Sequence, residues 1–170
     1  MKFISKMIAV AALALFGAVA PAHAQTHWTP FQPADGGFRI DFPGTPKVVR
    51  DTLPSAAGPA PHLSASYTSN GFSYVVELTT FASASPPKAV LDLYANGIGK
   101  TNKVRTQTTL KIGTLPARRF DVELTKGKLI GSMLFVTDGT RVYQVLCVSL
   151  RGHENSVYVK HFIGSFALTH

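Results

Sequence analysis

The stretch RFDVELTKGKLIGSMLFVTDGTRVYQVLCVS, residues 119–149, is the part of the sequence that says most about the fold. Its first part, Arg119–Thr125, alternates between apolar residues such as Phe120 and charged residues, and this pattern predicts a strand with one buried face. The next two parts, Lys128–Val136 and Arg141–Ser149, are apolar on both sides of a strand. Strands of that kind must be covered on both faces, so we expect protein to pack above and below the sheet.

Three glycine-containing dipeptides predict the hairpins that join the strands. Asn70-Gly71 joins a strand near Leu63–Thr68 to a strand at Phe72–Thr80, and Lys126-Gly127 and Asp138-Gly139 join the three strands of residues 119–149. Asn-Gly and Asp-Gly suit tight hairpins because both central residues of the turn take positive φ. The Lys-Gly turn is the weaker signal of the three.

The N-terminal third contains one strand pattern and one segment rich in turn residues. In Gly37–Pro43 the apolar residues Phe38, Ile40 and Phe42 alternate with other residues, which predicts a strand with these three on one face. The segment Pro54–Pro61 is low in complexity and rich in proline and alanine. We interpret it as a surface loop within one domain.

Two segments have the periodicity of helices. The first begins with Ser85-Pro86-Pro87, a capping residue followed by prolines suited to a first turn, and ends near Gly97–Gly99. The second runs from about Glu154 to Ser165. Two helices are enough to cover both faces of the sheet. The sequence therefore predicts a mainly antiparallel sheet with one helix on each face, which is an α/β/α sandwich of the α+β class.

The N-terminal residues have the three parts of a secretory signal peptide. Positive charge precedes an apolar run at residues 7–20, and Ala22-His23-Ala24 then has small residues at the positions that signal peptidase reads. The run is shorter than the roughly 20 residues of a membrane span, although a retained N-terminal anchor is the alternative. We expect residues 1–24 to be a cleavable signal peptide and residues 25–170 to form one domain in the periplasm or outside the cell.

The single cysteine, Cys147, excludes an intramolecular disulfide. It lies in the apolar run Val145–Val148, and free cysteine is among the residue types most often buried. Reactive cysteines instead lie in electropositive and partly open surroundings. The sequence therefore predicts a buried, unreactive thiol.

The residues that could carry catalysis or bind a metal do not form a recognisable group. His153 and His161 are eight positions apart, about 80° round a helix axis, so they do not share a face as a metal-binding pair would. Asp121 and Glu123 share one face of a strand and could act on a glycoside, but the basic residues around them favour surface ion pairs. No nucleotide-binding or nucleophile motif is present. We therefore predict no enzyme, no metal site and no cofactor.

A basic segment is the feature that departs most from an average composition. The net charge of +8 includes two lysines of the signal peptide, which leaves +6 for the mature chain, and Gly99–Phe120 carries six basic residues and no acidic one. If Lys103–Ile112 is a strand, Lys103, Arg105 and Lys111 lie on one face and the apolar residues lie on the other. These three are the candidate binding residues for a partner protein or an anionic envelope ligand. The alternative is that the charges protect an edge strand from aggregation.

Five stretches of the sequence carry a resemblance to known proteins. They are Trp28-x-x-Phe31, Gly36–Pro46, Pro116–Phe120, Arg141–Val145 and Phe162–Phe166, and together they span nearly the whole mature chain. These stretches resemble a large group of small secreted bacterial proteins without assigned activity. The group is similar in pattern to the PsbP-like fold, an α/β/α sandwich also found in an extrinsic subunit of photosystem II and in a Ran-binding import factor. The resemblance implies this fold and a role in binding macromolecules, and it carries over no functional residue.

The leading hypothesis is a non-enzymatic secreted or periplasmic domain that binds a partner protein or an anionic envelope ligand. The strand has no aromatic residues on which bases could stack, so nucleic acid is disfavoured as a partner. The rival hypothesis is a small hydrolase that acts on an envelope polymer through carboxylates the sequence does not identify. An enzyme should have a deep pocket with convergent titratable groups, whereas a binding module should have a flat or grooved basic surface.

Overall fold

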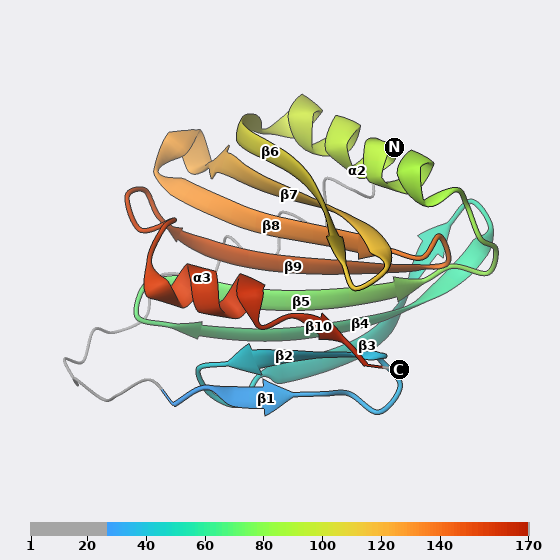
Figure 1. Cartoon of the computed structure of the whole chain (residues 1–170), viewed down its shortest axis with the longest axis horizontal. Coiled ribbons are helices and arrows are strands. Elements are labelled where there is room, and N and C mark those ends of the chain that lie inside the picture. The colour runs from blue at the N-terminus through green and yellow to red at the C-terminus, as the bar shows by residue number, and fades with distance from the viewer. Residues whose placement is uncertain (1–26, 170) are drawn as a thin grey trace.

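The computed structural model describes residues 27–169, so the predicted signal peptide lies outside the described residues. These residues form a seven-stranded antiparallel sheet of order β3-β4-β5-β9-β8-β7-β6, a three-stranded sheet of order β1-β2-β10, and the helices α2 (Pro87–Thr101) and α3 (Val157–Gly164) (Figure 1). The strands are β1 (Thr29–Phe31), β2 (Phe38–Phe42), β3 (Lys47–Ser55), β4 (Gly58–Ser69), β5 (Phe72–Thr80), β6 (Lys103–Ile112), β7 (Leu115–Leu124), β8 (Leu129–Thr137), β9 (Arg141–Leu150) and β10 (Ala167–Leu168).

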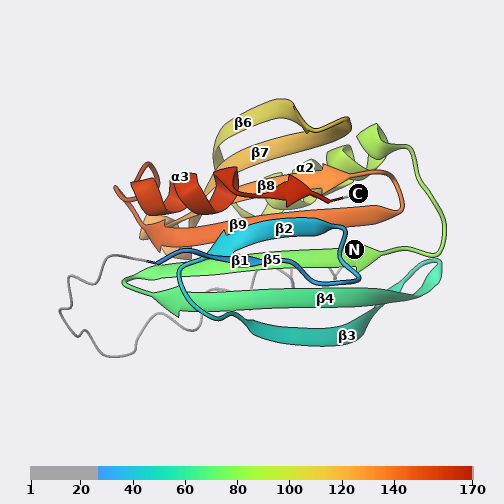
Figure 2. The ribbon, with the colours of Figure 1, turned by 60° about the horizontal axis from the view of Figure 1, so that its bottom comes forward.

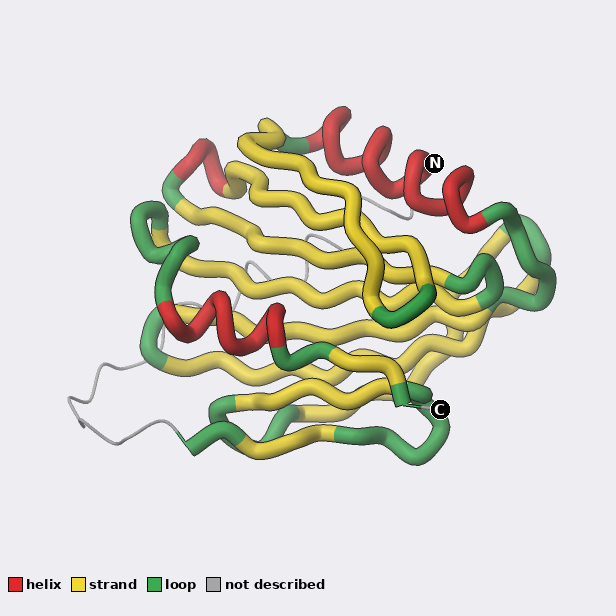
Figure 3. Tube along the Cα trace, in the orientation of Figure 1, coloured by secondary structure: helices red, strands yellow, loops and turns green. Residues whose placement is uncertain are grey.

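The two helices lie on opposite faces of the large sheet (Figures 1 and 3). Helix α2 packs on β6, β7 and β8, and its Ile98 joins Phe120 and Met133 in one buried apolar cluster. On the other face α3 packs on β8 and β9, and its Phe162 joins Phe38 of β2 in a second cluster. We call these the α2 face and the α3 face. The predicted sandwich of a mainly antiparallel sheet between helices is confirmed, and the small sheet extends the layer that contains α3 (Figure 2).

The central strands are buried as their composition predicts. Every residue of β8 is buried, and so is β9 from Val142 to Ser149. Cys147 of β9 is fully buried, as predicted, and burial raises the pKa of its thiol. Neither described helix has the length and apolar character that crossing a membrane requires.

The predicted hairpins form, but their turns use different chemistry. Asn70 and Gly71 have φ of 51° and 78°, so both central residues are left-handed as expected. At the β8–β9 turn only Gly139 has positive φ, and the side chain of Asp138 instead accepts hydrogen bonds from the backbone of Thr140 and Arg141. The expectation of two left-handed central residues is therefore right at the first turn and wrong at the last.

The segment Pro54–Pro61 is part of a hairpin, so its prediction as a loop is wrong. Pro54 pairs with Pro59, and the turn is confined to Ala56 and Ala57. Prolines are tolerated here because β3 is an edge strand and β4 begins to pair with β5 only at His62. The outer side of this part of the hairpin therefore has no further strand to which a backbone N–H would have to donate.

The first helix begins one residue later than predicted, and the second begins three residues later. Helix α2 starts at Pro87, with Pro86 at its cap position. Helix α3 starts at Val157 because Ser156 caps it, with the Val159 backbone N–H donating to the Ser156 hydroxyl at 3.4 Å. Glu154 therefore lies in the loop before α3, where it is free to reach another element.

Strand β6 contains a bulge that places its later residues on the opposite face of the sheet from the one expected. Val104 and Thr106 pair with consecutive residues of β7, which leaves Arg105 between them without a partner. One extra residue moves every later side chain to the opposite face. Val104 packs against the cluster under α2, whereas Leu110 and Ile112 pack against the cluster under α3. The prediction that the apolar residues of this strand share one face is therefore wrong.

Candidate functional site

The three predicted binding residues divide between the two faces of the sheet. Lys103 lies directly across from Glu123 on the α3 face, and Arg105 reaches Glu154 on the same side. Lys111 lies between two residues that pack under α3, so its side chain projects from the α2 face. The expected common basic face does not form, because the bulge at Arg105 moves the later residues of the strand, Lys111 among them, to the opposite face. A binding role for the three residues stays a prediction.

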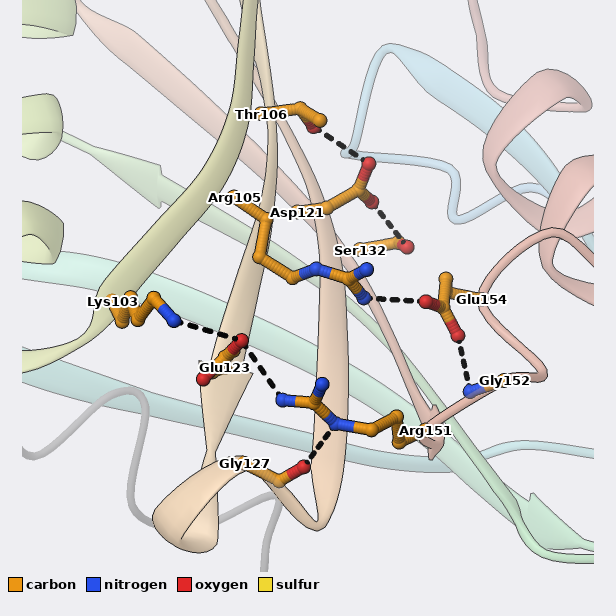
Figure 4. A network of polar contacts seen from close by, with 10 residues as sticks. All are labelled: Lys103, Arg105, Thr106, Asp121, Glu123, Gly127, Ser132, Arg151, Gly152 and Glu154. Carbon is orange, nitrogen blue, oxygen red and sulfur yellow. Dashed lines mark hydrogen bonds and ion pairs between the residues drawn. The ribbon is translucent and has the colours of Figure 1, made fainter.

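Glu123 of β7 is the centre of one ion-pair network (Figure 4). Its Oε1 lies 3.4 Å from Lys103 Nζ and 2.8 Å from Arg151 Nη2. Arg151 Nε also donates to the backbone oxygen of Gly127 at 2.6 Å, which ties the loop after β9 to the β7–β8 turn. Burial acts to raise the pKa of Glu123, but the two cations hold it below its ordinary value.

Arg105 is the centre of a second contact, which crosses from β6 to the loop before α3 (Figure 4). Its guanidinium pairs with one oxygen of Glu154, and the other oxygen accepts a 2.6 Å hydrogen bond from the backbone N–H of Gly152. The hydrogen bonds from the backbone and from Arg105 hold the pKa of Glu154 below its ordinary value. Arg105 is two positions after Lys103, so strand alternation places both on the α3 face, the side on which Glu154 lies.

Asp121 completes the polar surface of the α3 face. Thr106 Oγ1 donates to one of its oxygens at 2.7 Å, and Ser132 Oγ donates to the other at 2.6 Å (Figure 4). The prediction of surface ion pairs is confirmed for Glu123 and wrong for Asp121, which is held by two hydroxyl groups. Their partners differ from those we expected, since they come from strand β6, from β8 and from the loop after β9.

The charges within this network balance. Three cations face three carboxylates, and each carboxylate has at least one hydrogen-bond or ion-pair partner. The basic character that the sequence shows in Gly99–Phe120 is therefore largely cancelled where Lys103 and Arg105 lie. The carboxylates that cancel it come from β7 and from the loop before α3.

A shallow hollow of about 490 Å³ lies next to the network, and here positive charge remains. Among the described residues, neither Lys100 nor Lys126 pairs with a carboxylate, while Lys103 shares Glu123 with Arg151. The hollow is lined by Lys100, Thr101 and Asn102 at the end of α2, by Lys103 and Glu123, and by Thr125, Lys126 and Gly127 of the β7–β8 turn.

The turn that carries Lys126 has an unusual backbone. Thr125, Lys126 and Gly127 have φ of 46°, 54° and 78°, so three successive residues are left-handed. This conformation is strained for a β-branched residue such as Thr125, and such strain persists mainly where the surrounding structure imposes it. The turn fixes Lys126 at the rim of the hollow. The sequence analysis did not select Lys100 or Lys126 as site residues. Their positive charge and the Lys126-Gly127 turn are the signals that could have found them.

A second polar group, on the α2 face, was also missed. Glu77 of β5 lies beside His62 of β4, with 4.0 Å between Oε1 and Nε2, and its other oxygen has no hydrogen-bond partner. Burial and then the charge of Asp51 raise the pKa of Glu77 to about 7, while burial lowers the pKa of His62. The signal that could have revealed this pair is a lone acidic residue in the middle of an otherwise uncharged strand.

The two histidines weighed as metal ligands lie apart. His153 contacts the ring of Phe72, whereas His161 Nε2 lies 3.0 Å from Asp41 Oδ2 and its ring stacks on Trp28. In the described part of the chain, no three histidine, cysteine, aspartate or glutamate side chains come together as a metal would require.

Neither a family model nor a curated protein matches the sequence. Among solved structures, the chain is similar to the cyanobacterial PsbP, CyanoP, of Synechocystis sp. PCC 6803, with a TM-score of 0.57, 8% identity, and coverage of 89% of this chain and 98% of that one. LpqN of Mycobacterium tuberculosis, which is involved in cell envelope biogenesis, is 15% identical, with 85% and 91% covered and a TM-score of 0.44. PA94 of Pseudomonas aeruginosa, of unknown function, is 14% identical, with 79% and 92% covered and the same TM-score.

The likeness to CyanoP shows the fold, and it confirms the PsbP-like architecture that the sequence pattern predicts. At this level of identity the likeness carries no information about ligands or activity. Any function must therefore be argued from the surface of this chain itself.

Proposed function

We propose that residues 25–170 form a non-enzymatic domain of the periplasm or cell exterior that binds an anionic envelope ligand or an acidic partner protein. The observation that carries this proposal is the hollow at the end of α2, where Lys100 and Lys126 stand on the rim without a described carboxylate partner. Unpaired cations around a shallow hollow attract anions and speed their association. The predicted signal peptide supports the compartment.

The chemistry of the neighbouring carboxylates favours binding over hydrolysis. Asp121 accepts hydrogen bonds from two hydroxyl groups, and Glu123 is paired with two cations. A general acid needs a raised pKa, whereas the cations lower the pKa of Glu123. A hydrolase would have to use groups other than Asp121 and Glu123. This part of the surface therefore suits binding better than catalysis.

The test is a charge reversal with a matched control. Lys100→Glu with Lys126→Glu removes the rim charges, and Lys47→Glu with Lys160→Glu makes the same change in net charge at exposed positions elsewhere. The probes are phosphatidylglycerol vesicles for an anionic lipid surface and polyglutamate for an acidic protein, each at low and high salt.

We expect the rim variant to lose binding to one of these probes by about tenfold or more, and the control to keep most of it. Binding should also weaken as salt rises, because screening shortens the reach of charge from about 10 Å at 0.1 M to about 3 Å at 1 M. An equal loss in both variants would mean that only net charge matters. No binding to either probe by the unaltered protein would contradict the proposal.

A further inference from the structure

The outer edge of β6 is free to pair with an additional strand. β6 and β3 are the two outer strands of the large sheet, so one side of each backbone has no neighbouring strand among the described residues (Figure 2). An outer strand presents unpaired N–H and C=O groups, which can pair with an added strand. Natural proteins usually block such edges with charges, prolines or bulges.

The two edges differ in how they are blocked. β3 carries Lys47, Arg50, Asp51 and Pro54, so charge or proline recurs along its whole length. In β6 the charges and the bulge lie near its two ends, and the middle, Thr106–Leu110, contains no charge, no proline and no bulge.

The middle of β6 has the properties of a strand that can be paired. Its residues are three threonines, a glutamine and a leucine, and the four from Thr106 to Thr109 are exposed. Threonine is β-branched and favours extended backbone. Five residues match the length of a typical strand, about 17 Å. The open middle of β6 therefore offers both the backbone groups and the length that strand addition needs.

We propose that Thr106–Leu110 of β6 accepts an extended, acidic segment of a partner protein as an additional strand of the large sheet. This inference rests on the proposed function and names the class of partner. Hydrogen bonds between the two backbones would supply affinity, and side chains at alternate positions would supply specificity.

Charge gives the reason for an acidic partner. Lys111 follows the open stretch and makes no ion pair with the described residues, so a carboxylate at the matching end of an added strand would meet it. A second copy of this chain fits less well. Two β6 strands paired antiparallel about Thr108 would place Lys111 of each copy across from Arg105 of the other, and like charges directly opposite are destabilising.

The experiment starts from a displayed library of random ten-residue peptides, selected on the folded protein at low salt. We expect the enriched peptides to alternate β-branched residues and to carry acidic residues at one end. The best peptide is then added to the labelled protein, and amide hydrogen exchange is followed by NMR. Exchange should slow at alternate residues of Thr106–Leu110, whose N–H groups point away from β7, and should not change in Lys47–Ser55.

Two adjacent substitutions, Gln107→Pro and Thr108→Pro, separate strand pairing from other modes of binding. Neighbouring N–H groups point to opposite sides of a strand, so one of the two prolines removes a donor on the open side and leaves the pairing with β7 intact. The variant that folds like the unaltered protein should bind the peptide at least about tenfold more weakly. Thr52→Pro and Leu53→Pro make the matched change on β3 and should leave peptide binding unchanged.

Each other outcome overturns the inference. A library that yields no binder, a peptide that protects β3 in place of β6, or binding that survives both β6 prolines would each show that the edge is not used. A peptide lost in the Lys100→Glu, Lys126→Glu variant but untouched by the prolines would overturn strand addition while supporting the proposed function. The two failures are therefore distinguishable.

Discussion

Glu123 and Glu77 are carboxylates of the same sheet, yet they lie on opposite faces in opposite surroundings. Glu123 lies at the surface between Lys103 and Arg151, and these cations hold its pKa below the ordinary value although burial acts to raise it. Glu77 is buried beside a histidine 4.0 Å away, and burial raises its pKa to about 7. The α3 face therefore stabilises the charged form of Glu123, whereas the α2 face favours the neutral form of Glu77.

The largest loss of stability should come from a core substitution in β7, because this strand has core residues on one face and the polar surface on the other. Phe120 is buried under α2, while its neighbour Asp121 belongs to the polar surface of the other face. Phe120→Ala should lower the free energy of unfolding by about 3–5 kcal/mol, the usual cost of emptying a large aromatic site. Denaturant melts measure it, and a loss below about 1 kcal/mol would show that Phe120 does not lie in the core.

Glu77→Gln should change how the stability of the protein depends on pH. Because the pKa of Glu77 is about 7 in the folded protein against 4.5 ordinarily, its contribution to stability is present below pH 4.5 and lost as pH rises through 7. Each unit of difference corresponds to about 1.36 kcal/mol, so the loss is on the order of 3 kcal/mol. The glutamine variant should lack this loss and should therefore be the more stable protein above pH 7.

Three titratable groups face Glu77, and one of them changes the pH dependence of stability in the opposite direction. They are Asp51 of β3, His62 of β4 and Tyr94 of α2. The lowered pKa of His62 acts in the other direction, because it costs stability as pH falls below the ordinary value of 6.5. Unfolding should therefore be followed from pH 5 to 8 in both proteins and in His62→Gln. Parallel curves for the unaltered protein and Glu77→Gln would contradict the account.

Thr125→Gly tests whether the strained turn serves the hollow. Glycine adopts φ of 46° without the steric cost that threonine incurs, so the variant should gain up to about 1 kcal/mol in stability. It should also bind the anionic probe more weakly, because Lys126 would be held less firmly. The measurements are a thermal melt and the vesicle titration, with Thr114→Gly, in the exposed turn between β6 and β7, as the control. Lower stability in Thr125→Gly would show that the backbone there is not strained.

The smallest effect should come from Glu123→Gln, and its pH dependence should have the opposite sign to that of Glu77. Since the folded pKa of Glu123 is lowered, its contribution is present above the ordinary pKa of 4.5 and is lost as pH falls below it. The variant should differ from the unaltered protein at neutral pH and converge with it in acid. Divergence in acid would mean that Lys103 and Arg151 do not stabilise this carboxylate.

The sequence predicts the layers of this molecule better than its surface. Runs such as Leu129–Thr137, apolar on both sides, require cover on both faces, and that requirement is enough to predict the sandwich. The bulge at Arg105 has no signature in residue type, yet it moves Lys111 to the other face. The partners of Lys103 and Arg105 also come from distant parts of the chain. A local pattern of charge therefore shows that cations are present and does not show which of them are free.

An NMR titration of the labelled protein tests whether the rim of the hollow recognises anions. Polyglutamate and phosphatidylglycerol nanodiscs are the two titrants, and backbone amide shifts are the measurement. We expect the largest shifts, for at least one titrant, to fall in Lys100–Lys103 and Thr125–Gly127 and to disappear at high salt. Shifts of similar size spread over all exposed lysines, or concentrated around Glu77 and His62, would contradict it.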